Sequence, residues 1–293
     1  MVTTEQATAD LFTLATHLPF RIAPERGAAL VAEVFGPSGL EIRPSRVEAF
    51  FSSIVEDRAI YLSFAGLASL WSLSYAAFHT IDVATRLAAD PNVTADSVDL
   101  GELWAVMRLR DHVDYARRLF RADEDWPTGL AQPDAQAVLE TDEGRVNNLF
   151  FGALSWIMLH EIGHVHRDHS RLLGRDMKLT QEWEADHFAT CWILDEAEGL
   201  EREFRALAII VAMAWELLFE EARHGGDDHP PSILRFQDAA SWFELGEDSY
   251  ALESGVYLLK AIFDPATIMP AGLSARQAFD WMEARLIELF PRP

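Results

Sequence analysis

Apolar residues recur at intervals of three and four positions along most of the chain, and the residues between them are mainly Ala, Leu, Glu and Arg. This spacing puts the apolar side chains on one face of an α-helix. In residues 98–119, for example, Leu109, Val113 and Ala116 belong to one apolar stripe, while charged residues occupy the other faces. The pattern predicts a mainly α-helical protein, with one of its helices over residues 98–119.

One short segment has the composition of a β-strand. Residues 59–64 follow a charged turn at 56–58 and combine two aromatic residues with an isoleucine, all of which are common in strands. Gly66 permits a change of direction into a helix that we expect over residues 67–79. The predicted fold class is therefore mainly α within the α+β class, with this strand at the edge of a small sheet.

Proline and glycine gather at a few points that are typical of loops, and no repeat or linker divides the chain. We therefore expect one domain over residues 1–293. It would comprise an N-terminal helical region (1–47), a helical insertion (82–145) and a C-terminal helical part (146–293) that contains the candidate site described below. The expected loops are residues 36–39, 90–92, 126–129 and 225–228.

Charge and hydropathy argue against two classes of binding partner for this protein, nucleic acid and membranes. The formal net charge of −23, from 47 acidic and 24 basic residues, repels nucleic acid and anionic lipid, and no basic stripe offsets it. The charge-free run 59–81 is diluted by serine and glycine, and the apolar run 206–215 is short, so neither is expected to cross a membrane. We expect neither a nucleic-acid partner nor a membrane partner.

The cysteine content bears on the compartment. The single cysteine, Cys191, excludes an internal disulfide framework and fits a reducing environment. Residues 1–10 contain no lysine or arginine and lack the apolar run of a secretory signal. The expected location is therefore the cytoplasm. Cys191 itself lies in an apolar segment, where an unreactive buried thiol is the expected state.

The run His160-Glu161-Ile162-Gly163-His164 carries the most specific chemistry in the chain. On a helix predicted over residues 148–167, His160 and His164 project from one face and can share one zinc ion. Glu161 can then accept a proton from zinc-bound water as the water attacks a peptide carbonyl. Two histidines at this spacing also occur by chance, so the prediction depends on a third ligand.

A catalytic zinc site of this type commonly takes its third ligand from a glutamate on another helix. The helix predicted over residues 180–198 offers Glu182 and Glu184. Glu182 has Asp186 one turn further on, and a ligand histidine usually donates its second N–H to such a carboxylate. Glu182 is therefore the predicted ligand and Asp186 the predicted partner of His160, with Glu184 as the alternative ligand.

Four segments, in this order, resemble the gluzincin peptidases of the HtpX and BepA type. They are Glu48-Ala49-Phe50 followed by residues 60–67, the run His160–His164 with His169 beyond it, Glu182-Trp183-Glu184-Ala185-Asp186, and His229-Pro230-Pro231 with Arg235. Glu48 departs from the asparagine of that group, residues 82–145 are an insertion, and the membrane helices of HtpX are missing. A chain of this size without membrane helices is also similar to the Lit-type phage-exclusion peptidases, which cleave a host protein.

The resemblance implies a zincin-like metallopeptidase core with one zinc ion. It implies that His229 approaches the metal, to stabilise the oxyanion or to cap the zinc in a resting state, and that Arg235 orients the acidic residues. It further implies a strand that holds the substrate in extended form through backbone hydrogen bonds. In this chain that strand would be Ile60, Tyr61, Leu62, Ser63 and Phe64.

The predicted function is a zinc-dependent endopeptidase that acts on a selected protein or peptide substrate. The chain lacks the Gly-x-Met-Glu-Asn run of zinc aminopeptidases and the Gly-x-Ser-x-Gly elbow of serine hydrolases. The alternative is a non-catalytic zinc-binding regulator or partner-binding protein with a vestigial site. Glu161 argues against the alternative, because a purely structural zinc site has no need of a general base. The oligomeric state stays open.

Overall fold

The N-terminal part of the chain folds into one helix, several short helical turns and a small sheet. The computed structural model describes residues 2–36, 39–89, 101–169, 174–223 and 229–290. Helix α1 (Thr4–Ala15) begins at Thr3, whose side chain accepts a hydrogen bond from the backbone of Gln6 and so caps the helix. The short turns that follow are η1 (Leu18–Phe20), η2 (Pro24–Arg26), α2 (Gly27–Leu30) and η3 (Val31–Phe35).

The sheet has three strands, β1 (Glu41–Ser45), β2 (Phe51–Ile54) and β3 (Ala59–Ser63), in the order β1-β3-β2. β1 runs parallel to β3, and β2 runs antiparallel to it. The strand predicted at the edge is therefore the central one, with both of its sides hydrogen-bonded. Pro44 in β1 and two adjacent serines in β2 are unusual in strands, so these two strands are hard to recognise from composition.

Helix α3 (Phe64–Ala89) starts directly at the end of β3, so Phe64 is its first residue and is not part of the strand. The Ser63 hydroxyl accepts a hydrogen bond from the backbone N–H of Gly66 (2.9 Å) and caps the helix. The turn expected at Gly66 is absent. A Cβ atom there would lie 2.8 Å from Ser63 Oγ and 2.9 Å from the Phe51 ring, so close packing explains the glycine.

The single helix expected over residues 98–119 is interrupted, and its first three residues lie outside the described ranges. Helix α4 (Gly101–Val106) is followed by Arg108, which has a left-handed backbone (φ 54°) and separates α4 from α5 (Leu109–Leu119). Its guanidinium donates to Asp111 (2.6 Å) and to the backbone oxygen of Gly129 (3.0 Å), which stabilises the break. Apolar periodicity continues across this break, so periodicity alone does not reveal it.

The loops and helical regions predicted from the sequence agree with the structure in part. The turn expected at 126–129 is present one residue later, at 127–130, where Leu130 donates to the backbone oxygen of Pro127 (3.2 Å) and Gly129 has a φ of 79°. Of the loop expected at 36–39, residues 37–38 lie outside the described residues, as do the whole loops expected at 90–92 and 225–228. The N-terminal region expected to be helical also contains β1, and the expected helical insertion contains a segment without helix at 121–141.

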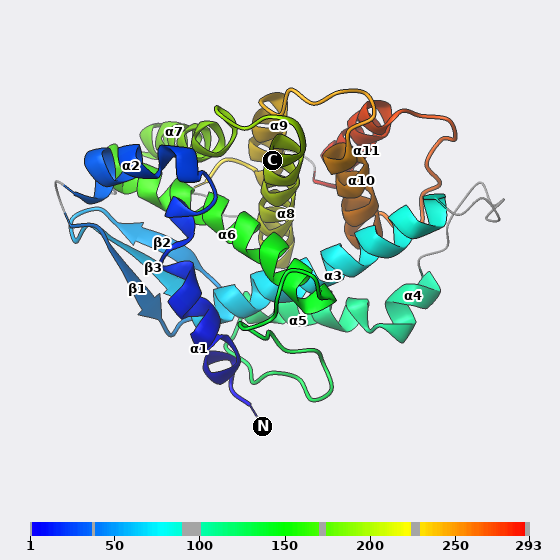
Figure 1. The fold of residues 1–293 in the computed structure, drawn as a ribbon, viewed down its shortest axis with the longest axis horizontal. Helices are drawn as coiled ribbons and strands as arrows, with labels where there is room; N and C mark the ends of the chain where they lie inside the picture. Colours follow the sequence, from blue (N-terminus) through cyan, green and yellow to red (C-terminus); the bar gives the residue numbers. More distant parts are fainter. Residues whose placement is uncertain (1, 37–38, 90–100, 170–173, 224–228, 291–293) are drawn as a thin grey trace.

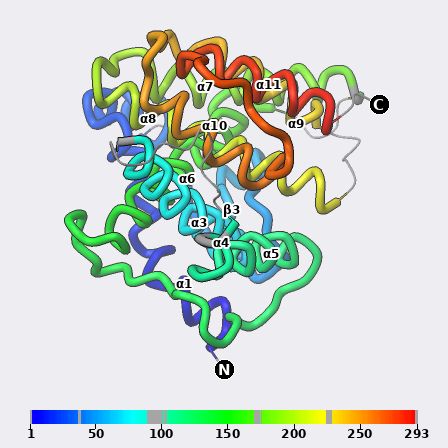
Figure 2. The backbone as a smooth tube through the Cα atoms, turned by 90° about the vertical axis from the view of Figure 1, so that its right-hand side faces the viewer, coloured from blue at the N-terminus to red at the C-terminus, as the bar shows by residue number. Residues whose placement is uncertain are grey.

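Helix α6 (Asp142–His166) crosses the centre of the molecule (Figure 1). It packs against α3, the sheet, α7 (Arg175–Leu194) and α8 (Gly199–Arg223). Helices α9 (Ser232–Ser241), α10 (Tyr250–Phe263) and α11 (Ala275–Leu289) complete the C-terminal part. Figure 2 shows α7 to α11 in the upper part of the view, α1, α4 and α5 in the lower part, and α3 and α6 between them.

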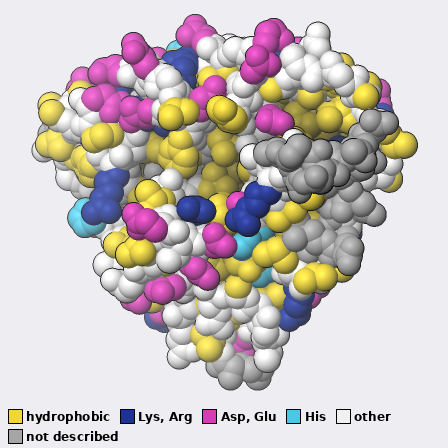
Figure 3. Space-filling model, turned by 45° about the vertical axis from the view of Figure 1, so that its right-hand side comes forward, with side chains coloured by type: hydrophobic (Ala, Val, Ile, Leu, Met, Phe, Trp, Pro, Cys, Tyr) yellow, Lys and Arg dark blue, Asp and Glu magenta, His cyan; other side chains and the backbone are white. Residues whose placement is uncertain are grey.

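Buried apolar residues from both parts of the chain form one hydrophobic cluster, as shown by Leu11, Trp71, Trp156 and Phe279, each of which is almost fully buried. The helices together with the three-stranded sheet confirm the predicted fold class, mainly α within α+β. Among the described residues, no helix has the length and hydropathy needed to cross a membrane. On the face shown in Figure 3, Asp and Glu side chains are widespread, whereas Lys and Arg form small separate groups.

Candidate metal centre

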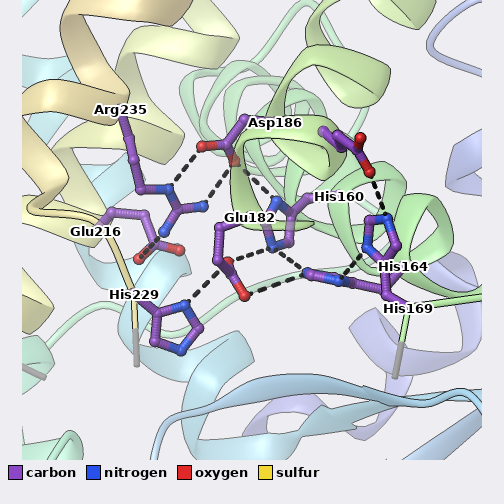
Figure 4. A network of polar contacts seen from close by, with 9 residues as sticks. His160, His164, His169, Glu182, Asp186, Glu216, His229 and Arg235 are labelled. Carbon is purple, nitrogen blue, oxygen red and sulfur yellow. Dashed lines mark hydrogen bonds and ion pairs between the residues drawn. The ribbon is translucent and has the colours of Figure 1, made fainter. Parts of the chain in front are cut away.

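Helices α6 and α7 bring the three predicted metal ligands together. The Nε2 atoms of His160 and His164 lie 3.1 Å apart, and Glu182 places Oε2 3.4 Å from the first and Oε1 3.5 Å from the second (Figure 4). One donor atom from each residue falls in a group within 4.8 Å. A Cβ on Gly163 would lie 3.2 Å from the Cα of Ala185, so this glycine permits the close helix approach that positions Glu182.

Asp186 joins His160, one of the predicted ligands, to Arg235. His160 Nδ1 lies 2.8 Å from Asp186 Oδ1, and Arg235 donates to both oxygens of that carboxylate at 2.7 Å. Figure 4 shows Asp186 between the two side chains. With its proton on Nδ1, His160 directs Nε2 towards Glu182. The pairing of His160 with Asp186 expected from the spacing is present, and Arg235 reaches the same carboxylate.

Burial and charge fix the ionisation of this cluster. Burial alone would raise the pKa of Asp186, but the Arg235 guanidinium and the hydrogen bonds from Arg235 and His160 hold it at about 2. Burial opposes ionisation of Glu182 as well, but the close contacts of its carboxylate with the His160 and His229 rings outweigh burial and lower that pKa. Burial and the neighbouring His160 lower the pKa of His164 to about 3. The centre therefore contains two carboxylates and a neutral imidazole.

The donor set fits a zinc ion. Two imidazole nitrogens and one carboxylate oxygen are the protein ligands of many catalytic zinc sites, which keep a further position open. Glu182 Oε2 is buried, lies 2.9 Å from His229 Nδ1, and accepts no hydrogen bond of normal geometry from the described residues. Such a buried charged oxygen beside two imidazole nitrogens is suited to a cation. Without a cation, the two carboxylates raise the pKa of His160 to about 10, although its burial acts in the opposite direction.

Glu161 lies on the same helix but outside the ligand group. It is 9% exposed, and burial raises its pKa, while the charge of His160 and a hydrogen bond with Ser53 oppose the rise. Ser53 belongs to β2, which packs against α6. The strand beside the predicted general base is therefore β2. The edge position predicted for the strand that begins at Ile60 is wrong, because β1 and β2 pair with both sides of β3.

His229 and Glu184 occupy different sides of the centre. His229 precedes α9, is about half exposed (49%), and lies next to Glu182. Glu184, the alternative ligand, is outside the ligand group and instead contacts His169 Nε2 at 3.0 Å. The structure thus brings Glu182 and His229 together and turns Glu184 away.

Two contributors were not singled out from the sequence. Ser53 was missed because β2 has no clear strand signal. Glu216 of α8 lies 3.5 Å from Arg235 Nη1, but it follows a long apolar run and has no motif around it. The one available signal was Arg235, because a buried arginine needs acidic neighbours and these can come from several elements.

A family model described as Peptidase U49 matches residues 60–255, which include all the predicted ligands and Arg235. The chain belongs to the peptidase U49 family. This U49 chain is also similar to the cell death peptidase of Escherichia coli strain K12, with 25% identity over 268 residues that cover 86% of this chain and 87% of that protein. No solved structure matches it. The two sequence matches confirm the resemblance drawn from the motifs and establish membership of a peptidase family.

Proposed function

We propose that this protein is a zinc-dependent endopeptidase that hydrolyses a peptide bond in a selected protein substrate. The observation that carries the proposal is the convergence of donor atoms from His160, His164 and Glu182 within 4.8 Å, with the buried carboxyl of Glu161 on the next residue of α6. The peptidase U49 match supports the reaction class. The donor set supports zinc as the metal.

A zinc ion held by these three residues would supply Lewis-acid activation of water and of the peptide carbonyl. Glu161 would take the proton from the attacking water and pass it to the leaving amine. The pKa of Glu161 is raised by burial, which brings this carboxyl closer to the range where one group can both accept and donate a proton near neutral pH. Glu161 is thus proposed as the general base and general acid.

His229 is proposed to stabilise the negative charge that develops on the carbonyl oxygen. The adjacent Glu182 carboxylate raises the pKa of His229, so its ring favours the protonated, donating form. Its position beside Glu182 and its partial exposure suit a residue that faces the substrate. Asp186 and Arg235 would keep His160 in the orientation that directs Nε2 to the metal.

The outer edge of β2 is proposed to bind the substrate backbone. β2 ends the strand order on the side next to α6, and no other strand of the described residues pairs with its outer side. An extended peptide added there would pass close to Glu161, because Ser53 of β2 contacts that carboxyl. The proposed partner is therefore a protein or peptide, and neither nucleic acid nor a membrane is proposed as a partner. A cytoplasmic location is proposed because it fits the single cysteine.

The test compares the wild type with Glu161→Gln in cells and in vitro. Zinc content is measured after dialysis, and new protein N-termini are identified across the proteome. We expect about one zinc in both proteins and new N-termini only with the wild type. Glu143→Gln, an exposed change on the same helix, is the matched control and should cleave normally. Full cleavage by Glu161→Gln would refute the mechanism, and zinc binding without any cleavage by the wild type would favour the regulator.

A further inference from the structure

The second ring nitrogen of His164 faces another histidine. His164 Nδ1 lies 2.9 Å from His169 Nδ1, and His169 Nε2 lies 3.0 Å from Glu184 Oε2. Figure 4 shows His169 on the side of His164 away from Glu182. His169 is buried (5% exposed) although it follows the end of α6. Neither His169 nor Glu184 takes part in the reaction proposed above.

One arrangement of protons satisfies all of these contacts when His164 binds a metal through Nε2. The metal-binding nitrogen has no proton, so the proton of His164 is on Nδ1 and is donated to His169. His169 Nδ1 then acts as the acceptor, which places the proton of His169 on Nε2. That N–H donates to the Glu184 carboxylate. Two neutral imidazoles thus form a chain that runs in one direction and ends on a negative charge.

We propose that His169 and Glu184 hold His164 in its metal-binding tautomer and thereby set the affinity of the centre for zinc. The inference rests on the proposed function only in taking zinc as the metal of this site. Partners of a ligand histidine fix its ring orientation and increase its basicity as a ligand. His169 and Glu184 are therefore positioning residues that act through His164.

The two ligand histidines are supported in different ways. Asp186, which supports His160, is 2% exposed and is fixed by two hydrogen bonds from Arg235. Glu184, at the end of the other chain, has a side chain that is 46% exposed and lines a surface pocket together with Arg167, Trp183, Asp238 and others. The support of His160 is thus closed off from solvent, whereas the support of His164 ends where solvent reaches it.

The first experiment measures zinc affinity by competition with a chromophoric chelator. We expect His169→Phe, which removes both contacts, to weaken zinc binding about 10- to 100-fold. His169→Asn should weaken it less, because the amide oxygen can accept from His164 but the side chain is too short to reach Glu184. Glu184→Gln keeps an acceptor and loses the charge, so a smaller loss of several-fold is expected. Glu196→Gln removes one exposed charge beyond the end of α7 and is the control for long-range electrostatics.

A double variant tests whether Glu184 acts through His169. In the His169→Phe protein, adding Glu184→Gln should change zinc affinity no more than adding Glu196→Gln does. Glu184 is exposed at the surface, so its variant is expected to fold even where a His169 variant does not. Equal affinity of wild type and Glu184→Gln, or a full additional loss in the double variant, would overturn the relay.

The second experiment detects the protons directly. Nitrogen-15 NMR of the zinc-loaded wild type should show His164 protonated on Nδ1 and His169 protonated on Nε2. A proton on Nδ1 of His169 would contradict the proposal, because that nitrogen could then not accept from His164. Failure of the wild type to bind zinc at all would instead overturn the proposed function, so the two failures are distinguishable.

Discussion

Asp186 binds Arg235 through both of its carboxylate oxygens, at 2.7 Å each, and the two side chains are 2% and 4% exposed. A buried pair of this kind loses hydration on both partners, so each charge depends on the other. Because Asp186 also accepts from His160, the pair connects α9 to a proposed metal ligand on α6. The stability of the fold and the orientation of a ligand therefore depend on the same contact.

Replacing Arg235 by Met should leave the Asp186 charge buried without its main partner. We expect the free energy of unfolding to fall by about 3–5 kcal/mol, measured by urea denaturation of the metal-free protein. Arg86→Met breaks an exposed i,i+4 pair with Asp82 and should cost less than about 1 kcal/mol. If both variants lost a similar amount of unfolding free energy, the buried pair would stabilise the fold no more than the exposed pair does.

The identity of the third ligand is tested by removing each glutamate. Glu182→Ala should abolish stoichiometric zinc binding, because it removes one of three donors. Glu184→Ala should retain about one zinc with weakened affinity, since Glu184 contacts His169 and lies outside the ligand group. Metal analysis after dialysis against a weak chelator separates the two. Loss of zinc in Glu184→Ala alone would reverse the assignment.

His229→Ala tests the proposed oxyanion role. The proposal predicts that kcat/KM falls about 100-fold, as expected when one donor to the developing charge is removed, while zinc content and unfolding free energy stay close to wild type. Pairing each kinetic measurement with metal analysis on the same sample is essential, because a loss of zinc would make His229 a ligand. Unchanged kinetics would leave it as an ordinary residue of the loop before α9.

His112, which lies outside the candidate metal centre, predicts a pH dependence of the free energy of unfolding. Its ring is 1% exposed and stacks on Tyr75 with the ring centres 4.3 Å apart, and burial lowers its pKa to about 4. Between pH 6.5 and 4 the unfolded chain binds this proton and the folded protein does not. The free energy of unfolding should therefore fall as the pH is lowered through this range, by up to about 3 kcal/mol from this residue.

The variant His112→Phe isolates this contribution. Its unfolding free energy should decline less steeply than that of the wild type between pH 6.5 and 4, and the two slopes should agree above pH 7. Val113→Ala on the same helix is the control, because it shortens a buried apolar side chain and should lower stability at every pH without changing the slope. Parallel curves for His112→Phe and wild type would contradict the assignment.

The parts of the site that could be predicted are those fixed by local geometry. His160 and His164 meet because residues four apart share a helix face, and the pairing of Asp186 with His160 follows from its position one turn after Glu182. Helix α6 was predicted for the same reason, although it starts earlier than expected, where Thr141 caps it. Each of these features depends on a few consecutive turns of one element.

The features that were missed depend on pairing between distant segments. The central position of β3 is decided by β1, which contains Pro44, and by β2, and neither has a strong strand composition. The break at Arg108 depends on its contact with Gly129, more than twenty positions away. Sequence periodicity contains no information on such contacts. The position of β3 in the sheet and the helix break at Arg108 are therefore visible only in the three-dimensional structure.

β2 lies before residue 60, where the U49 match begins, whereas α6, α7 and α9 lie inside it. If β2 receives the substrate as proposed, the segment that meets the peptide and the helices that hold the donor atoms occupy separate stretches of the gene. Ser53 of β2 also contacts Glu161, so a change in this segment that alters the substrate would reach the proposed general base as well. Target choice and hydrolytic chemistry would therefore be coupled traits, although their residues lie far apart in the sequence.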